Sequence, residues 1–342
     1  MDQHELFNHS QHGVRGGRSC LSQLLKHIDR ITSLLEGGSN VDVIYLDFAK
    51  AFDKVDIGVT LRKLKSLGIR GQLGRWLGSF LLDRQQTVVV DGQASLPRPV
   101  ISGVPQGSVL GPLLFLVLIG DIDGEVFSSF LSSFADDTRI GHHINDAEDA
   151  RQLQADLRKV YNWAKINNME FNAEKFELLR YKANCHNQRL ASPAEYRSSS
   201  GTPITEKEHI SDLGINLSHD TTFKYHIDKK ISAMKSKVSW ILRTFKTRAA
   251  LPMLTLWKQL VVSEHDYCCQ IWSPTKAGEI QALEAVQKCF TRKIDGTQGL
   301  SYWERLRNLK LYSLQRRRER YIAIYIWRIL EGQVPNLECT PI

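Results

Sequence analysis

The spacing of apolar residues in the first half of the chain predicts alternating helices and strands. Apolar residues recur at helical spacing over residues 21–35, and Gly37-Gly38 ends this helix. Residues 41–48 form an apolar strand with Asp47 near its end. The same rules predict helices over 61–67 and 76–82, and strands over 87–90 and 99–101 around an Asp91-Gly92 turn. They then predict a buried helix over 107–122 with Pro112 in its first turn, a hairpin over 130–140 tipped by Asp136-Asp137, a helix over 147–167 and a strand within 171–181.

The second half of the chain follows a different pattern. Residues 182–206 are polar and include Ser198-Ser199-Ser200-Gly201, which predicts a flexible connector. A short strand is expected over 209–217, and helical spacing continues from there to about residue 331. We therefore expect a mixed α and β front half and an all-α back half.

Composition and cysteine usage exclude several classes of protein. With 342 residues, 42% of them apolar, the chain can bury one large core or two ordinary ones. The apolar run within 109–119 is too short to span a bilayer, and the N-terminus lacks the features of a secretory signal. The six cysteines form no CxxC pair, which argues against a zinc finger or a disulfide framework. An intracellular protein, in the cytoplasm or nucleus and without a membrane partner, is expected.

The net charge of +8 is concentrated near the C-terminus. Residues 287–330 carry eleven Lys and Arg against three acidic residues, so this stretch contains the whole formal excess. Tyr and Trp residues are interleaved with the basic ones. Such a region suits contact with a nucleic-acid backbone, and the alternative is a solvated helix face over core aromatics.

Three carboxylates are the strongest candidates for chemistry. Asp47 closes an apolar strand, and Asp136-Asp137 lie at the tip of an apolar hairpin. If the two strands are neighbours, the carboxylates meet at one edge and need a cation such as Mg²⁺ or Mn²⁺. The alternative is that Asp-Asp is simply favourable turn chemistry. His142 and His143 follow the hairpin without metal-ligand spacing and are interpreted as surface residues.

Three sequence blocks resemble the polymerase motifs of one family. Residues 45–56 (YLDFAKAFDKVD) resemble motif A of non-LTR retrotransposon reverse transcriptases of the LINE type, jockey-like elements in particular. Residues 102–112 (SGVPQGSVLGP) resemble their motif B, and residues 134–137 (FADD) resemble motif C. The three blocks occur in the family's order and at ordinary spacing.

Weaker similarities extend the resemblance over roughly residues 10–335. Residues 11–19 resemble the fingers motif upstream of motif A, residues 168–175 resemble motif D, and residues 212–215 resemble motif E. Residues 300–306 and 314–318 resemble the region that follows the polymerase in these elements.

The resemblance implies roles for individual residues. Asp47, Asp136 and Asp137 would be the catalytic carboxylates that hold two Mg²⁺ or Mn²⁺ ions, and the backbone carbonyl of Phe48 would be a further ligand. Phe52 falls at the family's sugar-gate position. The bulk of its side chain there would clash with a ribose 2′-hydroxyl and so favour deoxynucleotides. Considered without the resemblance, Phe52 is better explained as a core aromatic.

Further residues are implied in nucleotide or template binding. Gln106 and Gly107 would open the motif B helix, where glycine permits close approach of the backbone. Lys175 corresponds to the motif D lysine, a candidate proton donor to pyrophosphate. Arg15 lies in a glycine-rich loop that would cover phosphates, although no P-loop pattern is present. The alternative interpretation of Gln106 and Gly107 is a turn before a buried helix. The alternative for the basic residues is that they are ordinary surface cations.

The resemblance implies an α+β fold built on a right-hand polymerase palm. The palm would be a split βαβ sheet with two helices on one face, followed by an all-α, basic, thumb-like region. We expect a reverse transcriptase domain over 1–217 and a helical region over 218–342. Within the first, the expected parts are a fingers remnant (1–40), the palm (41–181), and a connector with motif E (182–217).

The implied function is RNA-directed DNA synthesis. Two metal ions would support nucleotidyl transfer from dNTPs to a primer 3′-hydroxyl, with an RNA template and a DNA primer as partners. Only ten residues precede Gln11, so most of the fingers and an upstream endonuclease are expected to be absent. An inactive nucleic-acid-binding remnant is therefore the alternative. A phosphohydrolase with Asp47 as nucleophile would leave motif B without a role.

Overall fold

The structure, a computed structural model, describes residues 10–183 and 194–334, and it divides into two compact units, 1–208 and 209–342. Part of the predicted connector, residues 184–193, lies outside the described residues. Each unit is described by itself below. None of the described helices combines the length and the apolar character needed to cross a bilayer.

The first unit is built on a five-stranded sheet with the order β6-β7-β1-β8-β9. Its strands are β1 (Asn40–Leu46), β6 (Phe130–Phe134), β7 (Asp137–Ile144), β8 (Glu177–Tyr181) and β9 (Thr205–Glu206). Neighbouring strands are antiparallel except β8 and β9, which are parallel. The helices of this unit are α1 (Cys20–Glu36), α2 (Ile57–Ser66), α3 (Gly71–Leu81), α4 (Leu110–Ile119), α5 (Ala147–Ile166) and the short 3₁₀ turns Ile122–Glu125 and Ala173–Lys175.

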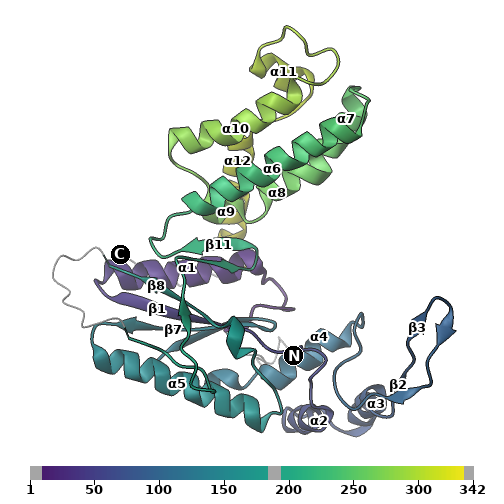
Figure 1. Cartoon of the computed structure of the whole chain (residues 1–342), viewed down its shortest axis with the longest axis vertical. Helices are drawn as coiled ribbons and strands as arrows, with labels where there is room; N and C mark the ends of the chain where they lie inside the picture. The colour runs from purple at the N-terminus through teal and green to yellow at the C-terminus, as the bar shows by residue number, and fades with distance from the viewer. Residues whose placement is uncertain (1–9, 184–193, 335–342) are drawn as a thin grey trace. The chain divides into compact units, whose positions relative to one another are not determined.

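Helices cover both faces of the sheet, and the side chains of β1 alternate between the two faces. Ile44 and Leu46 belong to the main core cluster, together with residues of α4 and α5. Tyr45 points to the other face, where its hydroxyl lies 3.3 Å from Nε2 of His27 on α1. Figure 1 shows α1 and α5 on opposite sides of the strands. The expected helices on one face are therefore present, and α1 is an addition that covers the other face.

Most predicted elements are found, with differences at their ends. The predicted helices 21–35 and 147–167 correspond to α1 and α5, whose N-caps are Ser19 and Asp146. The buried helix α4 begins at Leu110 rather than at residue 107, since Ser108 Oγ accepts a hydrogen bond from the backbone N–H of Gly111 at 3.0 Å. Pro112 does lie in its first turn.

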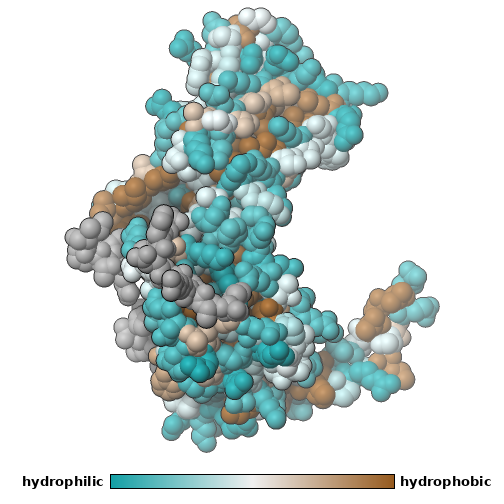
Figure 2. Space-filling view, turned by 60° about the vertical axis from the view of Figure 1, so that its left-hand side comes forward, coloured by the Kyte–Doolittle hydropathy of each residue, from teal (hydrophilic) through white to brown (hydrophobic). Residues whose placement is uncertain are grey.

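The Asp91-Gly92 turn is confirmed, but its strands pair differently from the prediction. Residues Val89–Val90 (β3) pair with Gln93–Ala94 (β4), and Gln85–Gln86 (β2) pair with Arg98–Pro99 (β5). Both turn residues have positive φ, +50° and +80°, as a two-residue hairpin turn requires. The projecting hairpin carries exposed hydrophobic residues (Figure 2), and Val88, Val89 and Val90 are among them.

The second unit is a helical bundle preceded by a small hairpin. Instead of the single predicted strand, β10 (His209–Asp212) and β11 (Ile215–Ser218) form an antiparallel pair, because Leu213 and Gly214 adopt positive φ and reverse the chain. The predicted helical back half is confirmed as α6 (Lys224–Thr244), α7 (Ala250–Leu256), a π-helical segment (Trp257–Val261), α8 (Val262–Asp266), α9 (Cys269–Trp272), α10 (Ala277–Thr291), α11 (Tyr302–Asn308) and α12 (Leu314–Leu330).

Candidate active site

The register of the central sheet places the predicted carboxylates at one end of it. Strands β1 and β7 are antiparallel neighbours, and Leu46 lies opposite Thr138. Continuing this register by one residue sets Asp47 opposite Asp137, the first residue of β7. Opposed Cα atoms of an antiparallel pair lie about 4.5–5.5 Å apart. Asp136 precedes Asp137 in the turn, so three carboxylates lie at the same end of the sheet.

The turn that carries Asp136 lies one residue earlier in the chain than predicted. Phe134 pairs with Asp137, so the two-residue loop consists of Ala135 and Asp136, and Asp137 belongs to the strand rather than to the tip. Ala135 has a φ of +53°, a left-handed conformation that is costly for a residue other than glycine. The surroundings must therefore stabilise this turn.

Gln11 provides that support, and we did not predict this role. Its buried side chain accepts hydrogen bonds from the backbone N–H groups of Ala135 (2.9 Å) and Gly13 (2.8 Å) and donates one to the Ala135 carbonyl (3.3 Å). The backbone also pairs, since the N–H of His12 donates to the carbonyl of Ser133 at 3.0 Å. Gln11 lies in the sequence block that resembles the fingers motif. Its place in that block was the only feature of the sequence that could have indicated a role.

We expect Gln11→Ala to destabilise the first unit by about 1–3 kcal/mol, because it leaves buried N–H groups without an acceptor. Gln11→Glu keeps an accepting oxygen but turns a buried carboxylate oxygen toward the Ala135 carbonyl, so it should also destabilise the unit. Urea denaturation measures the two free energies of unfolding, and hydrogen exchange of the Ala135 amide measures local opening. Equal stability of wild type and Gln11→Ala would contradict the proposed support of the turn.

The electrostatics at this end of the sheet favour a bound cation. Burial raises the pKa of Asp136, and the nearby charge of Asp47 raises it further. Burial also raises the pKa of Asp137, with added contributions from Asp136 and Asp47. The ammonium group of Lys175 lies 3.1 Å from Asp47 Oδ2. Carboxylates that repel one another offer hard oxygens, the ligand type that Mg²⁺ or Mn²⁺ prefers. Among the described residues, the oxygens of these three aspartates do not all lie within 4.8 Å of one another, so they would have to move closer around an ion.

Backbone bonds connect the segment after β1 to the segment before β8. The Ala49 N–H donates to the Glu170 carbonyl, and the Asn172 N–H donates to the Asp47 carbonyl, both at 2.8 Å. The rings of Phe48 and Phe171 stack with centroids 4.3 Å apart. These contacts place Lys175, which comes from the predicted motif D, beside Asp47.

Motif B is joined to the loop that follows Asp47. The Val104 N–H donates to the Phe52 carbonyl at 3.0 Å, and Gln106 Nε2 donates to Asp53 Oδ1 at 2.7 Å. Phe52 is half-buried, with its ring centroid 4.6 Å from that of Phe115 on α4. Gly107 is exposed and has a φ of +77°. The prediction that Gln106 and Gly107 open the helix is therefore wrong. Both residues lie in the turn before α4, which begins at Leu110.

Arg15 contacts the same loop that supports the carboxylate turn. Its Nη1 atom donates to the Gln11 carbonyl at 3.4 Å, and Arg18 donates to the same carbonyl at 2.7 Å. The glycine-rich segment is thus packed beside the turn that carries Asp136.

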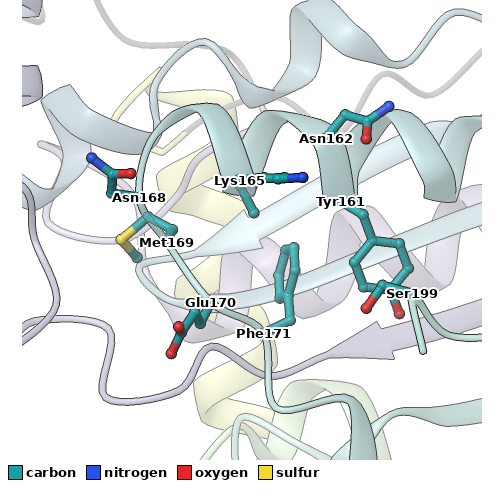
Figure 3. Close-up of a pocket in the computed structure, with 9 residues that line it drawn as sticks. Tyr161, Asn162, Lys165, Asn168, Met169, Glu170, Phe171 and Ser199 are labelled. Carbon is teal, nitrogen blue, oxygen red and sulfur yellow. The ribbon is translucent and has the colours of Figure 1, made fainter.

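A cavity of about 640 Å³ lies between the C-terminal end of α5 and the segment that follows it. Figure 3 shows its mixed aromatic and polar lining, with Tyr161 and Phe171 on one side and Asn168 and Glu170 on another. Phe171 and Glu170 also belong to the segment that bonds to the backbone after β1. The predicted carboxylates do not line this cavity, so we place the candidate active site at the end of the sheet.

The basic C-terminal stretch is only partly available for binding. Arg305 and Arg318 are buried, and Arg318 Nη1 lies 2.8 Å from Nε2 of His265. Arg317 forms a two-pronged ion pair with Asp266, with Nε and Nη2 within 2.8 Å of its two oxygens. These three arginines stabilise the bundle, which corrects the interpretation of the whole stretch as a nucleic-acid surface. The exposed basic residues are Lys288, Arg292, Lys293, Arg307, Lys310, Arg316, Arg320 and Arg328.

Comparison with known proteins covers most of the chain. Residues 1–217 match the family "Reverse transcriptase (RNA-dependent DNA polymerase)". The "Probable RNA-directed DNA polymerase from transposon X-element" and the "RNA-directed DNA polymerase from mobile element jockey", both of Drosophila melanogaster, are each 28% identical over 84% of this chain and 32% of their own length. The chain thus spans about a third of the length of these curated relatives.

Solved structures resemble the chain more distantly. The telomerase of Candida albicans in complex with a fragment of telomeric RNA is 12% identical, with a TM-score of 0.48, over 87% of this chain and 54% of that one. The apo telomerase of Candida tropicalis has the same identity and TM-score over 84% of this chain and 47% of that one.

Proposed function

Because the chain belongs to the reverse transcriptase (RNA-dependent DNA polymerase) family, we propose that it copies an RNA template into DNA by extending a primer 3′-hydroxyl with dNTPs. The relatives include polymerases of jockey and other mobile elements, which confirms the resemblance to non-LTR retrotransposon reverse transcriptases. The observation that carries the proposal is the β1–β7 register, in which Leu46, the residue before Asp47, lies opposite Thr138, the residue after Asp137.

The proposed metal ligands are Asp47, Asp136 and Asp137, with the Phe48 carbonyl as a further oxygen. Two Mg²⁺ or Mn²⁺ ions, when bound, would activate the primer hydroxyl and stabilise charge on the leaving pyrophosphate. Burial and then the neighbouring carboxylates raise the pKa values of Asp136 and Asp137, which supports this assignment because a bound cation would offset both effects.

Other residues would orient the substrates. Phe52, held against Phe115, would lie beneath the sugar of the incoming nucleotide and exclude a 2′-hydroxyl. Gln106 and Gly107 form an exposed turn that suits the template or the nucleotide, and Arg15 would contact phosphate. In this layout residues 1–217 form the polymerase domain and residues 218–342 form a thumb-like region on the template–primer duplex.

Lys175 is proposed to donate a proton to the pyrophosphate. Its side chain is 64% exposed, and its ammonium group donates a hydrogen bond to Asp47 Oδ2 at 3.1 Å. We expect Lys175→Met to slow nucleotide addition by about a hundredfold, with template–primer binding unchanged. Lys175→Arg keeps the ion pair with Asp47 but is a poor proton donor, so it should be similarly slow.

Single-turnover addition of one nucleotide measures this effect. Lys207→Met is the matched control, because Lys207 is an exposed lysine of the same unit that faces Glu177 at 4.0 Å. If Lys175→Arg adds nucleotides at the wild-type rate, Lys175 acts by positioning Asp47 rather than by donating a proton.

The exposed cations of α12 are proposed to bind the nucleic-acid backbone. Arg316 and Arg320 lie four residues apart on that helix and are both exposed. Replacing both by Gln should weaken duplex binding and lower the slope of log K against log salt by up to about 2. Lys224→Gln, which removes a lysine already paired with Asp228, should leave the slope unchanged. An unchanged slope in the double variant would exclude contact of these arginines with phosphate.

Primer extension tests the proposed function directly. The full chain is incubated with Mg²⁺, the four dNTPs and a labelled DNA primer annealed to an RNA template, and the product sequence is read. Extension that copies the template supports the proposal. Binding of the template–primer without extension, in Mg²⁺ and also in Mn²⁺, would instead support the inactive nucleic-acid-binding remnant.

A further inference from the structure

Two histidines and an aspartate meet near the C-terminal end of β7. His142 Nε2 lies 3.8 Å and His143 Nε2 lies 3.7 Å from the same oxygen, Asp149 Oδ1. The two imidazole rings lie with centroids 4.3 Å apart. One potential ligand atom from each of the three residues lies within 4.8 Å of the other two. A search of residues 10–183 and 194–334 finds this spacing in this group alone.

The edge of the sheet explains how consecutive strand residues converge. Side chains at successive positions of a strand normally point to opposite faces. Strand β6 pairs with β7 only as far as Gly141, so among the described strands none lies beside His142 and His143 on that edge. His142 shares its side of β7 with Ile140 and Ile144, which pack in the core with α5. Only the His143 ring therefore has to turn around this edge toward Asp149, in the first turn of α5.

The buried histidine is oriented for a ligand that the protein does not supply. The His142 side chain is 2% exposed, so its expected place on the surface was wrong. Its Nε2 atom has no hydrogen-bond partner among the described residues. A buried imidazole nitrogen without a hydrogen-bond partner can present its lone pair to a metal ion, as the nitrogens of metal-bound histidines do.

The carboxylate is likewise held in place. The Asn145 N–H donates to Asp149 Oδ2 at 2.8 Å, which leaves Oδ1 facing the two histidines.

We propose that His142, His143 and Asp149 bind one divalent transition-metal ion of the zinc class. Two imidazoles and a carboxylate suit Zn²⁺, whereas Mg²⁺ prefers oxygen ligands alone. Ligand atoms around a tetrahedral ion lie roughly 3.3 Å apart, so the three groups must close slightly. The His143 side chain is 41% exposed and has the freedom to do so.

The ion would clamp the open edge of β7 to the start of α5. This site is separate from the candidate active site, because Asp137 and His142 are five residues apart on one strand, about 17 Å along it. Three protein ligands leave a fourth position for water. The inference therefore does not depend on the proposed polymerase function.

Metal binding to the full chain tests the proposal. The protein is stripped with a chelator and titrated with Zn²⁺, and separately with Co²⁺, in an excess of Mg²⁺ that saturates oxygen-only sites. We expect one equivalent to bind, with a higher Tm and a visible Co²⁺ spectrum of a tetrahedral site. Failure of the wild-type chain to bind either ion would overturn the proposal.

Matched variants identify the ligands. His143→Ala and Asp149→Asn should each abolish both the Tm increase and the Co²⁺ spectrum. His219→Ala, at an exposed histidine of the second unit, and Asp136→Asn, at the candidate active site, should retain both. Undiminished binding by His143→Ala and Asp149→Asn would place the ion elsewhere and overturn the assignment.

Discussion

Asp136→Asn is expected to reduce primer extension by about a thousandfold or more. The substitution keeps the size of the side chain and removes one charge from the proposed metal site. Metal ions contribute several kcal/mol of transition-state stabilisation, and each 1.36 kcal/mol corresponds to a factor of ten in rate. Single-nucleotide addition on an RNA template, compared at saturating Mg²⁺, measures the loss.

The same variant should be at least as stable as the wild type at neutral pH without divalent ions. Burial and Asp47 raise the pKa of Asp136 in the folded protein, so its ionisation costs stability in full above that pKa, and the cost disappears only below the ordinary pKa of the carboxyl group. Asparagine removes this cost, and Tm should be unchanged or higher.

Asp91→Asn is the matched control for the effect on rate. It makes the same change in the exposed β3–β4 turn, where asparagine also tolerates positive φ. It should extend primers at the wild-type rate. Should Asp136→Asn remain as active as Asp91→Asn, the proposed metal site would be excluded. A large fall in the Tm of Asp136→Asn would show that its inactivity reflects unfolding.

Phe52→Ala is expected to raise the use of ribonucleotides relative to deoxynucleotides by about a hundredfold. The proposed reason is steric: the phenyl ring occupies the space that a 2′-hydroxyl would need. Competing incorporation of ATP and dATP opposite the same template base measures the ratio.

The packing of Phe52 on Phe115 adds a cost in stability. Because the ring is only half-buried, its removal should cost about 2 kcal/mol, less than a fully buried phenylalanine. Phe52→Tyr keeps the bulk of the ring and should keep the selectivity for deoxynucleotides. If Phe52→Ala folds, extends primers and still rejects ATP as strongly as Phe52→Tyr, then Phe52 is a core aromatic, which is the alternative that the sequence left open.

The elements that were predicted well are those with strong local signals. Helix α5 has a long amphipathic repeat and an Asp146 N-cap, and α1 begins at the Ser19 N-cap and ends at Gly37. The Asp91-Gly92 turn has the residue types that positive φ requires. The roles of Asp47, Asp136 and Asp137 came from the resemblance and stay predictions, although the sheet places them at one end.

Long-range contacts account for what the sequence did not predict. Gln11 supports a turn more than 120 residues away, and a local pattern carries no sign of such a bond. His142 was expected on the surface because its neighbours look like the end of a hairpin, yet the strand continues to Ile144 and packs against α5. Arg318 belongs to a basic run but is 1% exposed, since it bonds to His265 on another helix.

The sequence by itself determined the class of the fold, the order of its main helices and strands, and the family to which the chain belongs. These follow from periodicity, capping residues and short motifs, which act over a few residues or one turn. Only the tertiary structure decided which carboxylates face each other, which arginines are buried and where His142 meets Asp149. Strand register and burial depend on contacts between segments far apart in the chain, and a one-residue shift would turn each side chain to the other face.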